Sequence, residues 1–118
     1  MLPAASRLTH RDEFAAIVRR GRSSGRSRLV VHVGRLPDAS RPRAGFVVSK
    51  AVGGSVVRHR VARRLRHLVA PRLAQLPAST GLVVRALPPS AAATSAELAR
   101  DLDAGLRGAL RKLGEGVR

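Results

Sequence analysis

The amino-acid sequence predicts an α+β fold, in which helices pack on a small, mostly antiparallel sheet within a single domain, residues 1–118. Two observations predict it. Short runs rich in β-branched residues occupy positions 28–35, 43–50 and 81–87. Apolar residues recur with helical spacing before the first run, between the second and third runs, and after the third. The alternation of these patterns predicts the element order α-β-β-α-β-α.

The first helix is expected to begin near Thr9. A threonine followed by Asp12 and Glu13 resembles a helix start with a side-chain cap and acids in the first turn. An apolar stripe over residues 14–18 follows, and Gly21 is expected to end the helix.

The runs at 28–35 and 43–50 are interpreted as paired strands, because only a turn-rich segment separates them. The third run, 81–87, is closed by two prolines. The last helix opens with a capping box that joins Thr94 to Glu97. Leucines on one face of this helix are Leu98, Leu102, Leu106, Leu110 and Leu113.

Positive charge dominates the composition, with 23 Lys+Arg against 7 Asp+Glu and a formal net charge of +16. Residues 39–96 contain ten of these bases and no carboxylate. A codon preference would explain arginine in place of lysine, but it would not remove every acid from this stretch. The expected partner is therefore polyanionic, such as a nucleic acid, an anionic membrane surface or an acidic protein.

Five arginines lie within positions 58–66, in a segment of helical periodicity. On a helical wheel the apolar residues share one side, and the cationic residues form a continuous face on the others. The apolar side holds Val57, Val61, Leu65, Leu68 and Val69. The cationic face holds Arg58, His59, Arg60, Arg63, Arg64, Arg66 and His67, with Ala62 among them.

Two alternatives to nucleic-acid binding apply to this helix. An ordinary solvated helix usually mixes charges and pairs Glu with Lys one turn apart, and no carboxylate is present here. A membrane-surface helix usually carries Trp or Phe at the interface, and this segment has neither. The pattern favours binding to phosphates.

The sequence contains no cysteine, so it offers neither a disulfide framework nor a thiolate zinc site. Neither the long apolar run of a signal peptide nor a stretch of membrane-spanning length is present. The chain is expected to be cytoplasmic, with flexible ends at about 1–6 and 114–118.

Residues 45–69, GFVVSKAVGGSVVRHRVARRLRHLV, resemble the signature of the bacterial ribonuclease P protein subunit. That family typically shows a G-x-x-V-S-K strand, a glycine, and then a helix that begins A-V-x-R-N-R. The resemblance covers most of the chain. Residues 7–21 are similar to the family's first helix, 28–33 to its next long strand, and 81–86 and 95–102 to its last strand and helix.

The resemblance implies a ribosomal protein S5 domain 2-like fold of order α-β-β-(β)-α-β-α, with one optional strand and a left-handed βαβ crossover. It also implies a role in an RNA enzyme that removes the 5′ leader from precursor tRNA. The RNA subunit performs the Mg²⁺-dependent hydrolysis, and the magnesium is bound through that RNA. The protein binds the RNA subunit and the leader, and on its own it is expected to be catalytically inert.

The resemblance also implies site residues. Residues implied to bind the RNA subunit are Arg58, His59, Arg60, Arg63 and Arg66. Residues implied to form the leader-binding cleft are Phe14, His32 and Lys50. The sequence departs from the family pattern at His59, where Asn is usual, and at Ala51 and Ala62, where basic residues are common. Val18 and His32 stand where aromatic residues are common.

Neither a catalytic nor a metal site is expected in the protein itself. Its acids lie outside the basic centre, without the clustering that a two-metal nuclease needs. Its four histidines lack metal-ligand spacing to acids. Neither a membrane nor a small-molecule substrate is expected. A structural RNA-binding protein, such as a ribosomal protein or an RNA chaperone, is the alternative function that composition alone leaves open.

Overall fold

The computed structural model describes residues 2–37 and 39–115. Its order, α-β-β-β-α-β-α, confirms the predicted α+β class, and the extra strand, β1, precedes the two strands predicted at 28–35 and 43–50. The helices are α1 (Arg11–Arg20), α2 (Ser55–Leu73) and α3 (Ser95–Glu115). The strands are β1 (Arg22–Gly25), β2 (Leu29–Arg35), β3 (Arg43–Val47) and β4 (Thr80–Ala86). Two short 3-10 helices are η1 (Ala4–Ser6) and η2 (Pro88–Ala92).

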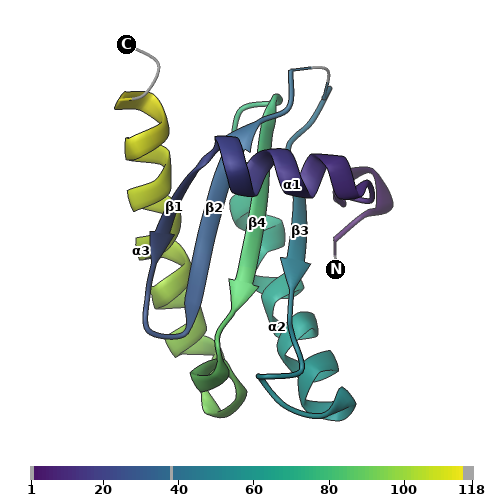
Figure 1. The fold of residues 1–118 in the computed structure, drawn as a ribbon, viewed down its shortest axis with the longest axis vertical. Coiled ribbons are helices and arrows are strands. Elements are labelled where there is room, and N and C mark those ends of the chain that lie inside the picture. The colour runs from purple at the N-terminus through teal and green to yellow at the C-terminus, as the bar shows by residue number, and fades with distance from the viewer. Residues whose placement is uncertain (1, 38, 116–118) are drawn as a thin grey trace.

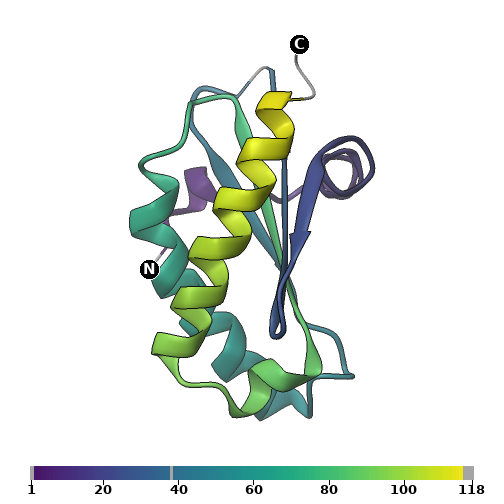
Figure 2. The same ribbon diagram turned by 90° about the vertical axis from the view of Figure 1, so that its left-hand side faces the viewer.

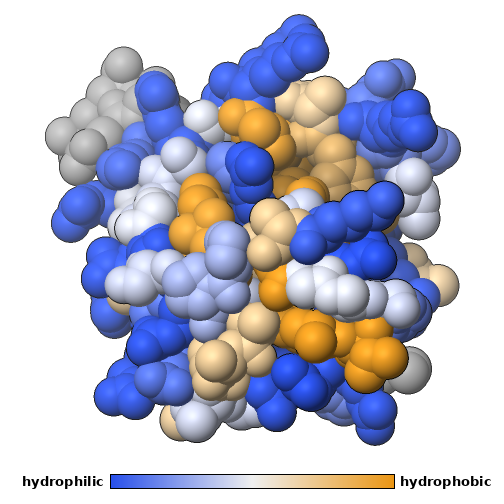
Figure 3. Space-filling view, turned by 60° about the horizontal axis from the view of Figure 1, so that its bottom comes forward, coloured by the Kyte–Doolittle hydropathy of each residue, from blue (hydrophilic) through white to orange (hydrophobic). Residues whose placement is uncertain are grey.

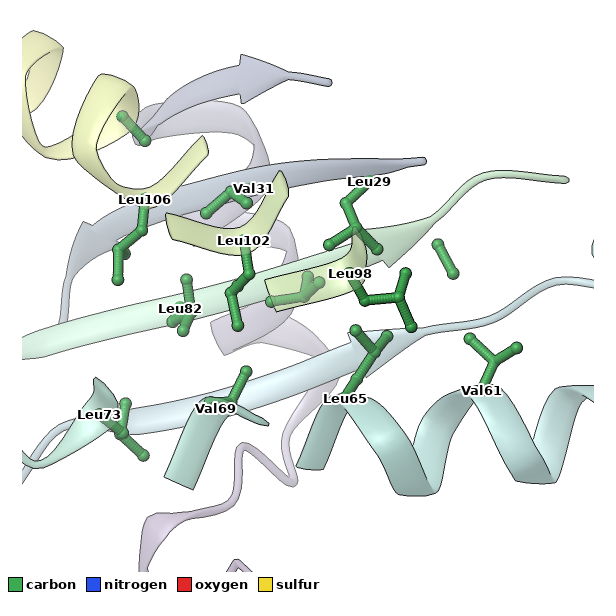
Figure 4. Close-up of a cluster of buried hydrophobic side chains, with 14 of the residues drawn as sticks. Leu29, Val31, Val61, Leu65, Val69, Leu73, Leu82, Leu98, Leu102 and Leu106 are labelled. Carbon is green, nitrogen blue, oxygen red and sulfur yellow. The ribbon is translucent and has the colours of Figure 1, made fainter. Parts of the chain in front are cut away.

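The elements form three layers. Helices α2 and α3 cover one face of the sheet, and α1 lies across one end of the other face (Figures 1 and 2). The main core lies between the sheet and the helix pair, where leucines and valines from α2, α3 and the strands meet (Figure 4). A smaller cluster under α1 is formed by Leu8, Ile17, Leu36 and Val83.

The strand order is β1-β2-β4-β3. Strand β2 pairs antiparallel with β1 and β4, whereas β3 pairs parallel with β4. The prediction that 28–35 and 43–50 pair with each other was wrong, because β4 lies between them. The three consecutive residues Leu82, Val83 and Val84 are fully buried on β4, so this strand is covered on both faces and takes a central position.

The connection from β3 through α2 to β4 is a left-handed crossover. In Figure 1 both strands run downward, β4 lies to the left of β3, and α2 lies behind the sheet. This confirms the crossover that the family resemblance implies, against the usual right-handed preference.

The structure tests three predictions about where the helices begin and end. The capping box is confirmed, since Glu97 N–H donates to Thr94 Oγ1 (3.1 Å) and Thr94 N–H donates to Glu97 Oε1 (2.9 Å). The prediction of Thr9 as a side-chain cap was wrong: His10 occupies the N-cap of α1 and makes no side-chain cap bond. Gly21 ends α1 as predicted, with its N–H donating to the Ile17 carbonyl (3.0 Å).

Near the start of the chain, Leu2 packs into the main core and is only 1% exposed. At the other end, residues 116–118 of the expected flexible segment lie outside the described residues. Within the described part of the chain, none of the helices combines the length and the apolar character needed to cross a membrane.

Candidate nucleic-acid interface

Helix α2 presents two different sides. Val61, Leu65 and Val69 are 0% exposed and face the sheet (Figure 4). The opposite side carries Arg60, Arg63, Arg66 and His67, which are all exposed. The predicted amphipathic helix is therefore confirmed, and its apolar side fixes which way the arginines point.

The cationic side of α2 is not neutralised by the residues that the structure describes. In the described residues, the cations found in ion pairs are Arg28, Arg43 and Arg72, and none of the five arginines of 58–66 is among them. A shallow hollow of about 680 Å³ runs along this outer side. It is lined by Ser55, Val56, His59, Arg60, Arg63, Arg64, Arg66 and His67.

Two of these arginines contact the segment that follows β4. Arg64 Nη1 donates to the Ala93 carbonyl at 2.9 Å, and Arg60 Nη2 donates to the Ala91 carbonyl at 3.2 Å. The Arg64 bond is partly buried, whereas the Arg60 bond is exposed. Arg64 therefore fastens α2 to the turn before α3, and Arg60 remains accessible to a partner.

A second hollow, of about 290 Å³, lies where α2 meets the edge strand β3. Arg58 and Arg66 lie on either side of Ala62, whose small side chain leaves room between them. The lining residues are Phe46, Val48, Arg58, His59, Ala62 and Arg66. The structure thus brings three of the five residues implied to bind RNA to one concavity.

Two of the three residues implied for the leader cleft, Phe14 and His32, lie at the face of the sheet opposite α2. The Phe14 ring from α1 lies directly on Gly45 of β3, since a Cβ added there would be 2.2 Å from Phe14 Cζ. His32 faces Val83 across the β2–β4 pair, and Val83 faces Gly45 across the β4–β3 pair. His32 and Gly45 therefore lie in one row of the sheet, about 10 Å apart at the backbone, and the Phe14 ring covers the Gly45 end of that row.

The chemistry of this row of the sheet suits a single-stranded nucleic acid. Burial and, to a smaller extent, the positive charge of Arg85 lower the pKa of His32 from its ordinary value of 6.5. The lowered pKa favours the uncharged imidazole at neutral pH, and an uncharged ring can stack on a base. The remaining predicted cleft residue, Lys50, is exposed in the turn between β3 and α2, beyond the end of the strand that carries Gly45.

Val18, which stands at a position where the family commonly has an aromatic residue, is 46% exposed on α1. Other exposed large apolar side chains are Val47 and Val56. On the face shown in Figure 3, hydrophobic side chains form separate patches among hydrophilic ones. The surface is therefore apolar only locally, which fits contact with bases and phosphates together.

Most carboxylates of the described residues already contact arginines. Glu97 and Asp101 pair with Arg28, and Asp103 pairs with Arg72 on α2. The Arg72 hydrogen bonds lower the pKa of Asp103. Within the described part of the chain, no group of three or more His, Asp or Glu side chains is arranged to hold a metal ion.

Comparisons with known proteins agree on one family. The Ribonuclease P family model matches residues 2–110. The ribonuclease P protein component of Streptomyces griseus is 57% identical over the full length of both chains. That of Beutenbergia cavernae is 58% identical over 90% of this chain and 89% of its own length.

Solved structures show the same fold. The RNase P protein of Staphylococcus aureus superposes with a TM-score of 0.79 at 22% identity, covering 92% of this chain and 96% of that one. The RNase P protein of Thermotoga maritima gives a TM-score of 0.72 at 21% identity, covering 89% and 96%. Fold, cationic helix and sequence relatives therefore point the same way: the chain belongs to the ribonuclease P protein family, the protein component of the endonuclease that matures the 5′ ends of tRNA.

Proposed function

We propose that this protein binds the ribonuclease P RNA through the outer side of α2, with Arg58, His59, Arg60, Arg63 and Arg66 as the contacting residues. The observation that carries the proposal is the unneutralised cationic side of α2, whose arginines make no ion pair within the described residues. Repulsion among these charges costs stability in the free protein, and RNA phosphates would relieve it.

The 5′ leader of precursor tRNA is proposed to lie on the opposite face of the sheet. Phe14 and His32 supply rings for stacking at one row of the sheet, and Arg85 supplies a positive charge on the same face. Lys50 is proposed to contact a leader phosphate beyond the end of β3. Stacking and phosphate contacts tolerate different sequences, which suits a protein that meets many leaders.

The hydrolysis is assigned to the RNA subunit, which would hold the catalytic Mg²⁺. The carboxylates at Glu97, Asp101 and Asp103 support this division, because each already contacts an arginine of the fold. The protein would contribute binding and positioning, and the complex would act in the bacterial cytoplasm on tRNA transcripts.

Reconstitution tests this function. A bacterial ribonuclease P RNA with the purified protein is expected to remove the leader from precursor tRNA at a low Mg²⁺ concentration where the RNA alone is slow. The matched control is the protein carrying Arg58→Ala and Arg66→Ala together, which should restore little activity. The protein without RNA should not cleave.

Two outcomes of this assay would contradict the proposal. Failure of the wild-type protein to raise cleavage would remove the assignment to this RNA enzyme and favour a structural RNA-binding role. Robust cleavage by a rigorously RNA-free preparation would show that the protein itself is the nuclease.

A further inference from the structure

Two hollows meet at the edge strand β3. The 290 Å³ hollow between β3 and α2 shares Phe46 and Arg66 with a second one of about 200 Å³. The second hollow reaches Phe14 and Gly45 on the other side of the same strand. Successive residues of a strand point to opposite faces, so Phe46 points to the α2 side and Gly45 to the α1 side.

The lining of these hollows is suited to a nucleotide. Phe46 is half-buried and packs its inner part on the core, so the ring is held in place while part of it remains open. Arg58 and Arg66 stand beside it, and neither hollow is lined by a carboxylate. By contrast, the two hollows at the β2–β3 loop include Glu13, a carboxylate that pairs with Arg43 at 3.5 Å.

Arg58 adds a second observation. Its Nε is buried and has no hydrogen-bond partner among the residues that the structure describes. An unpaired buried donor is unfavourable, so an acceptor that enters the adjacent hollow would be stabilised by this N–H. A phosphate oxygen or the edge of a base offers such an acceptor, and Ala62 leaves the space for it.

We propose that the hollow between β3 and α2 binds one unpaired nucleotide of the RNA subunit, with its base stacked on Phe46 and its phosphate held by Arg58 and Arg66. This inference rests on the proposed RNA-binding role of α2. It adds a base-stacking subsite to a helix whose other contacts are with phosphates, and it places that subsite on the face of β3 opposite the leader cleft.

The first test compares the affinity of wild-type, Phe46→Leu and Arg66→Ala proteins for the RNA subunit, in the absence of precursor tRNA. Leucine keeps apolar packing but removes the aromatic face, so affinity should fall about fivefold or more. Phe46 neutralises no phosphate, so the slope of log affinity against log salt should stay at the wild-type value. Arg66→Ala should reduce that slope by about 0.7–0.9.

The second test does not require a substitution at the site. Phe14 and Phe46 are the only aromatic residues of the 118 apart from histidines, so protein labelled with 4-fluorophenylalanine gives two ¹⁹F signals. The signal that is lost in the Phe14→Leu protein belongs to Phe14, and the signal that remains belongs to Phe46. The RNA subunit alone should shift the Phe46 signal through the ring current of a stacked base, and leader-bearing precursor tRNA should then shift the Phe14 signal.

The outcomes separate this inference from the function on which it rests. A fall in affinity of Phe46→Leu at constant salt slope, together with a shifted Phe46 signal, supports the subsite. Wild-type affinity in Phe46→Leu, or a Phe46 signal unmoved by the RNA subunit, overturns it while the salt-dependent binding of the wild-type protein stands. A Phe46 signal that moves only when the leader is added would assign the hollow to the leader instead and overturn the proposal.

Discussion

Replacement of Arg58 or Arg66 by alanine is expected to weaken binding to the ribonuclease P RNA by roughly 1.5–3 kcal/mol, the worth of a hydrogen bond to a charged group. Both side chains line the hollow beside Ala62, and neither forms an ion pair within the described residues. Their guanidinium groups are therefore available for phosphates. Filter binding with the RNA subunit at fixed salt and Mg²⁺ measures the loss.

Arg64→Ala is the matched control on the same helix. Arg64 donates a partly buried hydrogen bond to the Ala93 carbonyl, so its group already has a partner in the fold. Its removal should cost RNA binding no more than ~1 kcal/mol, as for a solvated surface charge. Equal losses at Arg58, Arg64 and Arg66 would show that bulk charge, and not a distinct face of α2, attracts the RNA.

Leu65→Ala is expected to lower the free energy of unfolding by about 2–5 kcal/mol. Leu65 is 0% exposed and lies where α2 packs on the sheet (Figure 4), so truncation leaves a cavity that rigid neighbours fill only in part. Urea denaturation monitored by circular dichroism measures the change. The same buried side of α2 keeps the arginines pointing outward, so the loss also weakens the support of the RNA-binding face.

Val56→Ala is the control for this substitution. Val56 lies on the same helix but is 79% exposed, so its truncation should change the free energy of unfolding by at most about 0.5 kcal/mol. A similar small change in both variants would mean that α2 does not pack on the sheet through Leu65.

Features decided by neighbouring residues could be predicted from the sequence. The capping box needs only the spacing of Thr94 and Glu97, and both of its hydrogen bonds are present. The orientation of α2 follows from the periodicity of Val61 and Leu65, which a helical wheel displays directly. Thr9 shows the limit of such patterns, because the helix begins after His10 and the threonine makes no cap.

Features decided by distant residues could not be predicted from local patterns. The pairing of β2 with β4 joins segments about fifty positions apart, and nothing in either run specifies the other. Strand β1 is a short polar segment, RSSG, without the alternation that predicts strands, and it forms because β2 offers it an edge. The crossover hand came from family resemblance alone.

The candidate site likewise has some features that could be predicted from the sequence and others that could not. The cationic face was visible in the sequence because its residues are adjacent. The contact of Arg64 with Ala93 was not, since it depends on where η2 ends. The position of Phe46 beside Arg58 and Arg66 depends on the packing of α2 against β3, and the position of Phe14 on Gly45 depends on how α1 crosses the sheet.

A salt titration of binding tests the central claim, that unneutralised arginines on α2 bind RNA phosphates, most directly. The affinity of the wild-type protein for the ribonuclease P RNA should fall linearly in a plot of log affinity against log salt concentration, with a slope of about −0.7 to −0.9 for each phosphate neutralised. An affinity that is unchanged across a several-fold increase in monovalent salt would contradict a phosphate-dominated interface.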